Sequence, residues 1–431
     1  MPDPSPRSAP SRQRRRPALA ALLLAISTAI SCDVADDPSQ EPVGRHHHRS
    51  EEPESTPPAA TDDRAKEHRH AKEHGKRSDG NDGEAPSTDI DPAAADSKPS
   101  GSASTLATDR DAKPGPGVAW YVTLHDQGAR DPVTGQESVL GFGASGRAAG
   151  GVLSKVPDDD GALQDLRGML VLADRSLLVI SAWKHNTQIL RFGPPADDAR
   201  RPFLEVFTRS GDDNPLLVHP YAMAVAPDGS ILVSNQDSNT VTRHGAPGSA
   251  NSGKPLGLDG SPALSSNDAG LVVPSHEMTK DGVKEVRGIA VLPDGTLLVA
   301  DRGKGEVSRW SLATGERLGT IASKADGIET PIQLLVAPDG RTLYISDNKR
   351  NEVFTLALPD GKPAVFIGGD AQIDATSSLA IHDGYLYVGS RKAREILRFR
   401  LSDAAPDEKP FIADLPDNPE FLILNPTETA P

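Results

Sequence analysis

The stretch Arg287–Asp301, RGIAVLPDGTLLVAD, contains the pattern that decides the fold. An apolar run leads into Pro-Asp-Gly, and a second apolar run then ends in a small polar residue. Both runs are short and rich in Val, Ile and Leu, which favours strands over helices. Asp-Gly supplies the positive-φ position that a tight hairpin turn needs. The stretch therefore predicts two antiparallel strands joined by a short turn.

The same pattern, with Pro-Asp-Gly or a relative of it at the turn, occurs four more times along the chain. Each copy is followed by a short polar loop and a third apolar run, such as EVSRW at 306–310. The copies start about 42 to 66 residues apart, and a four-stranded unit at such a period is typical of a propeller blade. The other copies are RGMLVLADRSLLVIS (167–181), YAMAVAPDGSILVSN (221–235), IQLLVAPDGRTLYISD (332–347) and SSLAIHDGYLYVGS (377–390).

The two ends of this repeat region hold the parts of one more unit. Five complete units occupy about 166–415, and Glu420–Leu424 has the character of a first strand with no others after it. Before the repeats, Trp120–Leu124, Ser138–Phe142 and Gly151–Val156 have the character of three strands without a first one. Joining these pieces closes a ring and leaves no exposed sheet edge at the seam. We therefore predict an all-β, six-bladed β-propeller closed in this way, with a seventh, degraded blade as the alternative.

The repeat resembles those of NHL-type and SMP-30/gluconolactonase-type six-bladed propellers. The resemblance covers about 166–424 and implies the architecture, while activity depends on the site that a fold carries. Lactonase-type relatives use a divalent metal held by Glu, Asn and Asp at the channel mouth. Only Asp347 matches that set here, because Ile332 stands where the family has Asn and the Glu has no counterpart. Lactone hydrolysis is therefore not favoured.

Composition divides the chain into an aromatic-free part and a core-forming part. All 3 Trp, 5 Tyr and 9 Phe residues follow residue 117. We interpret 32–117 as a disordered linker rich in Pro, Ser and charge, and 118–431 as the propeller. Six His between His46 and His74 are interpreted as polar linker residues, with a metal-binding tract as the alternative. The net charge of −15 argues against nucleic acid as a partner, and we expect a monomer.

The N-terminus has the features of an export signal. Basic residues at Arg12 and 14–16 precede the apolar run Ala18–Ile30, which is too short to span a bilayer. Residues 1–31 are therefore predicted to be a signal peptide. Ser31-Cys32 resembles a bacterial lipobox, which implies that Cys32 becomes the lipidated N-terminus and that a membrane of the cell envelope is a partner. The alternative is an ordinary signal peptide with a chance cysteine, and which membrane is involved stays open.

Polar residues end the second strands of the repeats. Asn235, Asp301 and Asp347 lie on successive blades. Three such side chains converging on the ring axis would hold Ca²⁺ or another divalent cation. The alternative is that each Asp caps the turn that follows it. No cofactor is firmly predicted.

The starts of the first strands offer a candidate anion site. Arg167, Tyr221 and Arg287 begin three of the repeats, with Ile332 and Thr376 at the same place in the others. Two guanidinium groups and a phenol near one opening would clamp a carboxylate or phosphate. The alternative is an Arg–Asp pair between blades, such as Arg287 with Asp301.

The loops after the second strands carry eight bases and one acid, Asp237. Such loops would focus the electrostatic field on an anionic ligand, an acidic glycan or a partner protein. We therefore expect a binding or scaffold module that acts through this face, with a metal-dependent hydrolase or lyase of the SMP-30/lactonase type as the alternative. The bases are Lys184, Arg302, Lys304, Lys349, Arg350, Arg391, Lys392 and Arg394.

Overall fold

The computed structural model describes residues 117–125, 130–161, 163–197, 199–263 and 269–425. The chain divides into two units, Met1–Ala95 and Asp96–Pro431, and every described residue belongs to the second. The predicted signal peptide, Cys32 and the His-rich linker therefore lie outside the described residues. Within the described residues no helix is long and apolar enough to cross a membrane.

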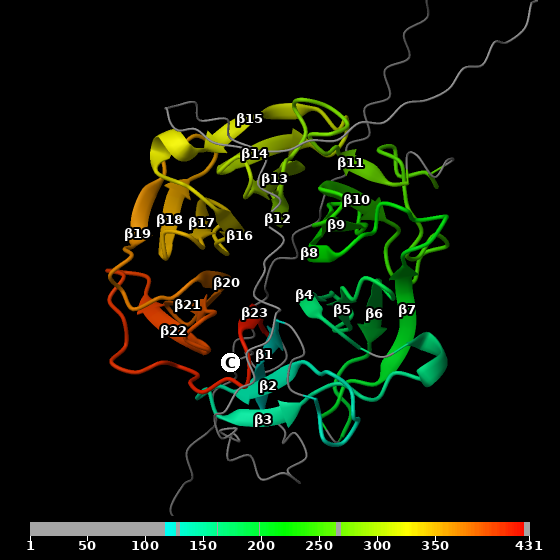
Figure 1. Cartoon of the computed structure of the whole chain (residues 1–431), viewed down its shortest axis with the longest axis horizontal. Coiled ribbons are helices and arrows are strands. Elements are labelled where there is room, and N and C mark those ends of the chain that lie inside the picture. The colour runs from blue at the N-terminus through cyan, green and yellow to red at the C-terminus, as the bar shows by residue number, and fades with distance from the viewer. Residues whose placement is uncertain (1–116, 126–129, 162, 198, 264–268, 426–431) are drawn as a thin grey trace, which may run out of the picture. The chain divides into compact units, whose positions relative to one another are not determined.

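The second unit is a six-bladed β-propeller, as the repeats predicted (Figure 1). Six antiparallel sheets surround a centre, and the first strand of each sheet is innermost. Two short 3-10 helices, η2 (Asp158–Asp160) and η3 (Lys324–Asp326), lie in connections. Blade 1 consists of β4 (Leu166–Val171), β5 (Leu177–Ser181), β6 (Gln188–Phe192) and β7 (Phe203–Arg209); blade 2 of β8 (Pro220–Val225), β9 (Ile231–Asn235), β10 (Thr240–His244) and β11 (Leu271–Val273); blade 3 of β12 (Val286–Val291), β13 (Thr296–Asp301), β14 (Glu306–Ser311) and β15 (Arg317–Ala322). Blade 4 consists of β16 (Pro331–Val336), β17 (Thr342–Asp347), β18 (Glu352–Ala357) and β19 (Ala364–Ile367); blade 5 of β20 (Thr376–His382), β21 (Tyr385–Ser390) and β22 (Glu395–Arg400); blade 6 of β23 (Pro419–Leu424), β1 (Val118–Leu124), β2 (Leu140–Gly143) and β3 (Ala148–Gly151).

Blade 6 closes the ring with strands from both ends of the propeller, as predicted. Its strand order is β23-β1-β2-β3, and Val122 pairs with Leu422 across the seam. The prediction for its outermost strand was wrong, because β3 is Ala148–Gly151 rather than 151–156. A tight turn at Gly146, where φ is 78°, brings Ala148 back onto Phe142. The chain beyond β3 instead bridges to blade 1, where Leu153 pairs with Arg201.

The first strands pack tightly against one another, which explains their small residues. A Cβ on Gly168 would lie 2.7 Å from the backbone oxygen of Tyr221, and one on Gly288 would lie 2.7 Å from that of Ile332. Such contacts are too short for a side chain, so glycine is required where neighbouring backbones approach. The equivalent residue of blade 2, Ala222, is buried. The prediction of close backbone approach at the two glycines is confirmed.

Candidate functional site

Every blade has a register shift at the same place in its first strand. The first residue of the strand pairs with the residue that ends the neighbouring strand, as Val286 pairs with Asp301 in blade 3, and the register then shifts. A bulge of this kind re-aims the side chain that it contains. We call the six residues that follow these first pairs the ring residues, and in blade order they are Arg167, Tyr221, Arg287, Ile332, Ser377 and Glu420.

The three residues of the predicted anion site are ring residues, and two of them are in contact. The guanidinium of Arg287 lies 5.7 Å from the ring centroid of Tyr221. The starts of the strands differ slightly from the prediction, because β4, β8, β12 and β16 begin one residue earlier. The blade-5 counterpart is therefore Ser377 rather than Thr376. Sequence reasoning did not include Glu420, which completes the ring from the closing strand.

Glu420 is the acceptor around which the basic side chains gather. It is 3% exposed, and its Oε2 lies 3.3 Å from Nη2 of Arg391, 3.9 Å from Nη1 of Arg167 and 3.7 Å from Nδ1 of His125. Burial raises the pKa of Glu420, but the charges of Arg391, Arg167 and His125 and a hydrogen bond with Tyr221 outweigh burial and hold the pKa below its ordinary value. A carboxylate held ionised in this way is a weak base, so neutralising the arginines fits it better than proton abstraction.

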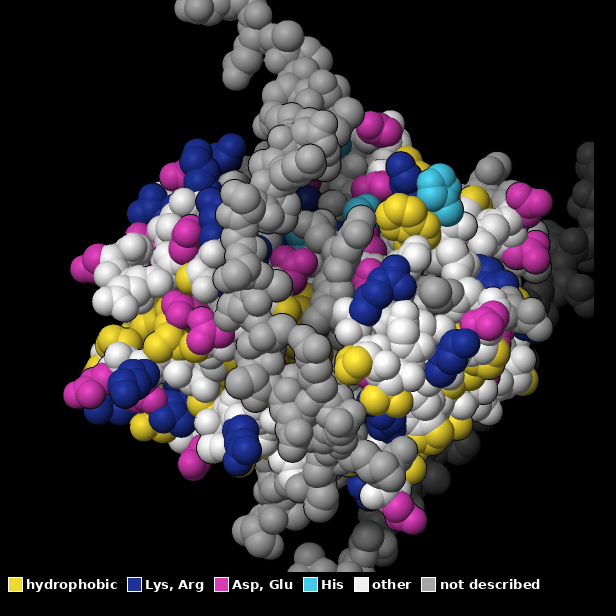
Figure 2. All heavy atoms as spheres, turned by 60° about the horizontal axis from the view of Figure 1, so that its bottom comes forward, with side chains coloured by type: hydrophobic (Ala, Val, Ile, Leu, Met, Phe, Trp, Pro, Cys, Tyr) yellow, Lys and Arg dark blue, Asp and Glu magenta, His cyan; other side chains and the backbone are white. Residues whose placement is uncertain are grey.

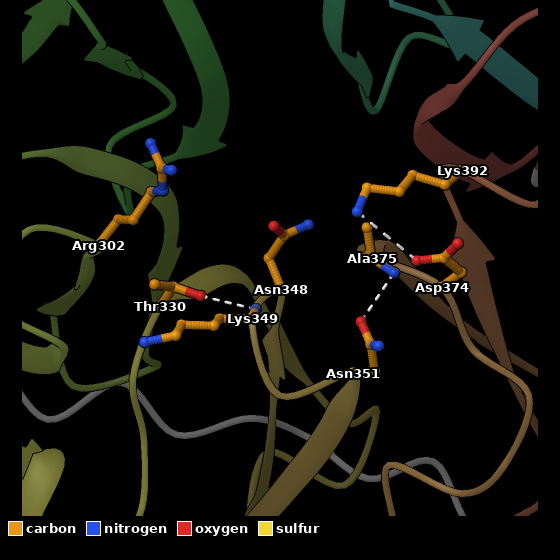
Figure 3. Close-up of a pocket in the computed structure, with 8 residues that line it drawn as sticks. All are labelled: Arg302, Thr330, Asn348, Lys349, Asn351, Asp374, Ala375 and Lys392. Atoms are coloured by element: carbon orange, nitrogen blue, oxygen red, sulfur yellow. Dashed lines mark hydrogen bonds and ion pairs between the residues drawn. The ribbon is translucent and has the colours of Figure 1, made fainter. Parts of the chain in front are cut away.

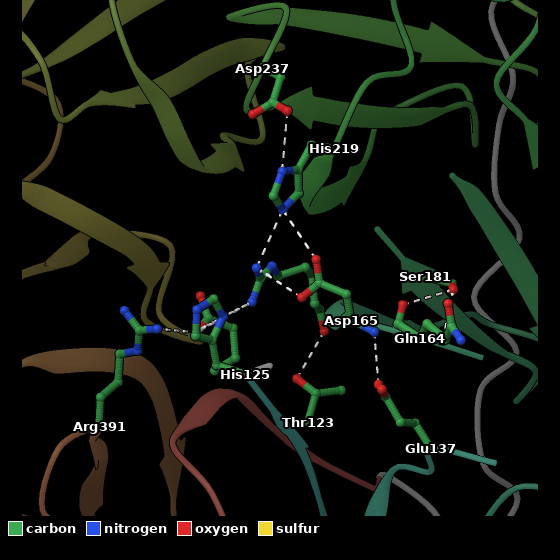
Figure 4. Close-up of polar contacts among 11 residues, drawn as sticks. Thr123, His125, Glu137, Gln164, Asp165, Ser181, His219, Asp237 and Arg391 are labelled. Atoms are coloured by element: carbon green, nitrogen blue, oxygen red, sulfur yellow. Dashed lines mark hydrogen bonds and ion pairs between the residues drawn. The ribbon is translucent and has the colours of Figure 1, made fainter. Parts of the chain in front are cut away.

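A second group of charges continues this cluster toward blade 2 (Figure 4). Arg167 forms an ion pair of 2.9 Å with Asp165, and His219 bridges Asp165 and Asp237 at 3.4 and 3.3 Å. Burial lowers the pKa of His219, but its hydrogen bonds to the two carboxylates have the larger combined effect and raise the pKa. Asp165 is thus neutralised by both neighbours.

Glu137 supports Asp165 from blade 6. Its Oε2 accepts a hydrogen bond of 2.7 Å from the backbone N–H of Asp165, and the side chain is buried. Burial raises the pKa of Glu137 to about 7, and the nearby charge of Asp165 also raises it. Glu137 therefore titrates near neutral pH at the edge of the charged cluster.

We call the face of the propeller that holds the starts of the first strands and the loops after the second strands the loop face. Six of its eight loop bases are ion-paired, but mostly to acids that the sequence analysis did not consider. Arg302 pairs with Glu285 at 3.4 Å, and Lys349 pairs with Glu329 at 2.7 Å. These acids lie directly before the first strands of their own blades. The positive field over the face is therefore weaker than the loops alone suggested.

A polar pocket opens on the loop face over blades 3, 4 and 5 (Figure 3). Its volume is about 330 Å³. Three basic side chains line it, and their exposed fractions are 43% for Arg302, 68% for Lys349 and 70% for Lys392. Asp374, which lies 3.8 Å from Lys392, is the acid in its lining. Neutral donors and acceptors complete the lining: Thr330, Asn348 and Asn351.

Basic and acidic side chains alternate over much of the visible surface (Figure 2). Lys and Arg side chains gather at the upper left of that view, beside fewer acidic ones.

The residues predicted to hold a metal are each bound within their own blades. Asp301 accepts hydrogen bonds from the backbone N–H groups of Lys284, Glu285 and Lys304. Asp347 caps its loop in the same way, with the backbone N–H of Glu329 at 2.6 Å. The amide nitrogen of Asn235 donates within blade 2, to Val233, Thr240 and Thr242. Among the described residues no group of three or more His, Cys, Asp or Glu is placed to hold a metal ion.

Glu420 and His125 form the part of the cluster that sequence reasoning missed, whereas Arg391 was predicted only as one of the loop bases. Glu420 was assigned to a first strand, but only the alignment of all six first strands by their bulges shows that it occupies the same position as Arg167 and Arg287. His125 follows β1 directly, so its place in the cluster depends on closure of the ring. The signal in the sequence was the alignment of the repeats. Extended to Glu420–Leu424 in blade 6, that alignment places Glu420 at the position of Arg167.

Comparison with known proteins supports the fold and goes no further. No family model and no curated protein matches the sequence. A solved structure of a nidogen/laminin complex is similar over 72% of this chain and 98% of that chain, at 12% identity and a TM-score of 0.50. A putative 6-phosphogluconolactonase from Bacteroides uniformis matches over 67% of this chain and 81% of that chain, at 14% identity and a TM-score of 0.44. At such identities the likeness concerns architecture: the chain is a six-bladed β-propeller.

Proposed function

We propose that this protein is a binding module that takes an anionic ligand, or an acidic region of a partner protein, on its loop face. The observation that carries this proposal is the pocket lined by Arg302, Lys349 and Lys392. Polar pockets with a few placed cations recognise carboxylate and phosphate groups. Thr330 and Asn348 add neutral hydrogen-bonding groups beside the cations.

The ion pairs of the pocket leave its cations available. Lys349 and Lys392 are mostly exposed, and surface ion pairs contribute only about 0–1 kcal/mol each. An incoming dianion can therefore replace Glu329 or Asp374 as the partner at low cost. Such exchange is favoured because the ligand meets several cations at once.

Binding of defined polyanions to the full-length protein tests the proposal. Polygalacturonate and pyrophosphate would be titrated at low ionic strength, where surface charges are least screened. We expect at least one to bind, and the double variant Lys349→Ala/Lys392→Ala to weaken it about tenfold, which corresponds to about 1.4 kcal/mol. Lys362→Ala is the matched control, because Lys362 is exposed in the β18–β19 connection at the opposite face. Equal affinities of the double variant and the wild type, or no binding of either polyanion, would contradict the proposal.

We further propose that the propeller is exported and anchored to a membrane through a lipid on Cys32. The basic and apolar segments before this cysteine, and the long polar segment after it, support the proposal. Labelling of expressing bacteria with an alkyne fatty acid should mark the wild-type protein and not Cys32→Ala. Equal labelling of the two proteins, or no labelling of either, would refute lipid attachment at this residue.

A further inference from the structure

Arg287 is a buried arginine whose charge has no carboxylate partner among the described residues. Its side chain is 8% exposed, and its one hydrogen bond is from Nη1 to the backbone oxygen of Val286, at 2.8 Å. That acceptor belongs to the preceding residue. The remaining guanidinium donors therefore have no acceptor in the described part of the chain.

Two other buried arginines show how this protein satisfies such a group. Arg201, which is fully buried, donates to Tyr121, Arg175, Gly193 and Asn425 at 2.7 to 3.3 Å. Arg167, at the same ring position as Arg287, has an ion pair with Asp165 and shares Glu420 with Arg391. Burying a charge without a partner costs several kcal/mol, so Arg287 is the exception.

The surroundings of Arg287 leave its charge uncompensated. Burial lowers its pKa and the charge of Arg302 lowers it further, while Glu285 and Glu420 act from beyond ion-pair contact. Glu285 pairs with Arg302, and Glu420 is surrounded by Arg391, Arg167 and His125. The two acids that act on Arg287 therefore both have other cationic partners.

A neutral polar side chain of the following blade packs against Gly288, the residue after Arg287. Gln333 is 8% exposed, and its Oε1 lies 2.9 Å from the position that a Cβ on Gly288 would occupy. The carboxamide oxygen of Gln333 therefore lies where the first strands of blades 3 and 4 pack, against the residue that follows Arg287. The face of Tyr221 bounds the guanidinium on the blade-2 side.

We propose that Arg287 is the anchor for one oxyanion group, a carboxylate or a phosphate, that enters the ring at blade 3 beside the face of Tyr221. This inference rests on the proposed function and assigns the ligand group that reaches deepest into the loop face. A guanidinium forms two parallel hydrogen bonds to such a group. Arg302 lines the pocket, and its charge also lowers the pKa of Arg287, so the pocket and the anchor have this residue in common.

Calorimetric titration of the full-length protein with inorganic phosphate and with citrate tests the anchor. We expect Arg287→Met to weaken binding at least tenfold, while Lys362→Ala changes it less than threefold. The melting temperature of Arg287→Met should equal or exceed that of the wild type, because the substitution removes an uncompensated buried charge. Binding of phosphate alone would assign a phosphate group, and binding of citrate alone would assign a carboxylate.

The same titrations separate the two proposals. If Arg287→Met binds like the wild type and Lys349→Ala/Lys392→Ala does not, the anchor is refuted while the proposed function stands. If the wild type binds neither these anions nor the polyanions, both proposals fall. A large drop in the melting temperature of Arg287→Met would show that Arg287 is structural and would also overturn the anchor.

Discussion

Glu420 lies within ion-pair distance of Arg167, one of the three residues that the sequence predicted to bind an external anion, and of the loop residue Arg391. The neighbours of each ring arginine therefore decide whether its charge is available to bind a ligand. Arg167 is neutralised by the protein itself, whereas Arg287 is not. The same residue type at the same strand position thus has two different roles. The difference arises from the neighbours that the ring brings to each position.

Removal of the charge of Glu420 should destabilise the protein strongly. In Glu420→Gln the buried charge of Arg167 and the partly exposed charge of Arg391 lose their shared carboxylate, and breaking a buried pair costs about 3–5 kcal/mol. The free energy of unfolding, measured with urea at pH 7, should fall by that amount. Glu408→Gln, at an exposed position, should change it by less than about 0.5 kcal/mol. A similar small effect for both variants would contradict the assigned role of Glu420.

The lowered pKa of Glu420 also predicts a pH dependence. The folded pKa lies below the unfolded value, so the stabilisation is complete above about pH 4.5 and is lost as the pH falls through the folded pKa. Glu420→Gln should lack this loss in acid. If the free energy of unfolding falls equally steeply below pH 4.5 in the wild type and in Glu420→Gln, the predicted pH dependence of Glu420 is wrong.

Glu137 predicts the opposite dependence near neutral pH. Its pKa of about 7 exceeds the unfolded value, so the folded state binds the extra proton and stability falls as the pH rises from about 4.5 to 7. Glu137→Gln cannot lose this proton, and it should gain up to about 3 kcal/mol relative to the wild type between pH 5 and pH 8. Urea unfolding at the two pH values measures the change. Glu277→Gln, at an exposed position, is the control, and an equal change in both variants would contradict the prediction.

The elements that build the site are the six innermost strands. Each has its bulge next to the loop face, so the repeat presents six side chains at one level whatever their identity. Close packing behind the bulges fixes this level. Gly168 and Gly288 follow the ring residues and allow the next first strand to approach.

A methyl group at one of these contacts should disturb the packing of blade 3 on blade 4. In Gly288→Ala the new Cβ would lie 2.7 Å from the backbone oxygen of Ile332, and overpacking of this kind costs about 1–3 kcal/mol. Gly211→Ala is the matched control, because a Cβ there would meet nothing within 4 Å and Gly211 has no positive φ. Urea unfolding compares the two. If both variants are equally stable, the backbones are not in the close contact described.

At the scale of the whole molecule, closure of the ring creates the charged cluster. Glu420 comes from the last strand, Arg167 from blade 1 and Arg391 from blade 5, and blade 6 brings them together. The seam also buries aromatic side chains: the rings of Phe421 and Tyr221 lie 5.1 Å apart. The charged cluster can therefore form only when the ring closes.

Truncation should reveal this dependence. A chain ending at Asn418 lacks β23, so β1 loses its inner partner and Arg167 and Arg391 lose the carboxylate of Glu420. We expect cooperative thermal unfolding to be lost and binding of a hydrophobic dye to appear. A chain ending at Asn425 retains β23 and should unfold like the full-length protein. Cooperative unfolding of the shorter chain at an unchanged temperature would show that the seam is dispensable.

The sequence by itself determined the blade repeat and predicted six blades with a seam between both ends of the propeller, and the structure excluded a seventh blade among the described residues. The repeat follows from local signals, because short apolar runs and tight turns act within about 15 residues, with Asp-Gly at the turn in blades 2 to 5. The sequence also placed the starts of these first strands, at Arg167, Tyr221 and Arg287, within one residue of their positions in the structure. The assignment of the outermost strand of blade 6 failed, because a turn at Gly146 outweighed the apolar run that follows.

Only the tertiary structure decided which charges meet. Asp301 caps the turn that follows it, which was one of two alternatives in the local sequence, whereas Glu420 reaches Arg167 from 253 residues away in the chain, a pairing that local sequence does not show. Strand propensity is a property of neighbouring residues, whereas the partner of a buried charge depends on how separate blades are placed around the axis. For that reason the fold could be predicted from the repeats, and the unpaired state of Arg287 could not.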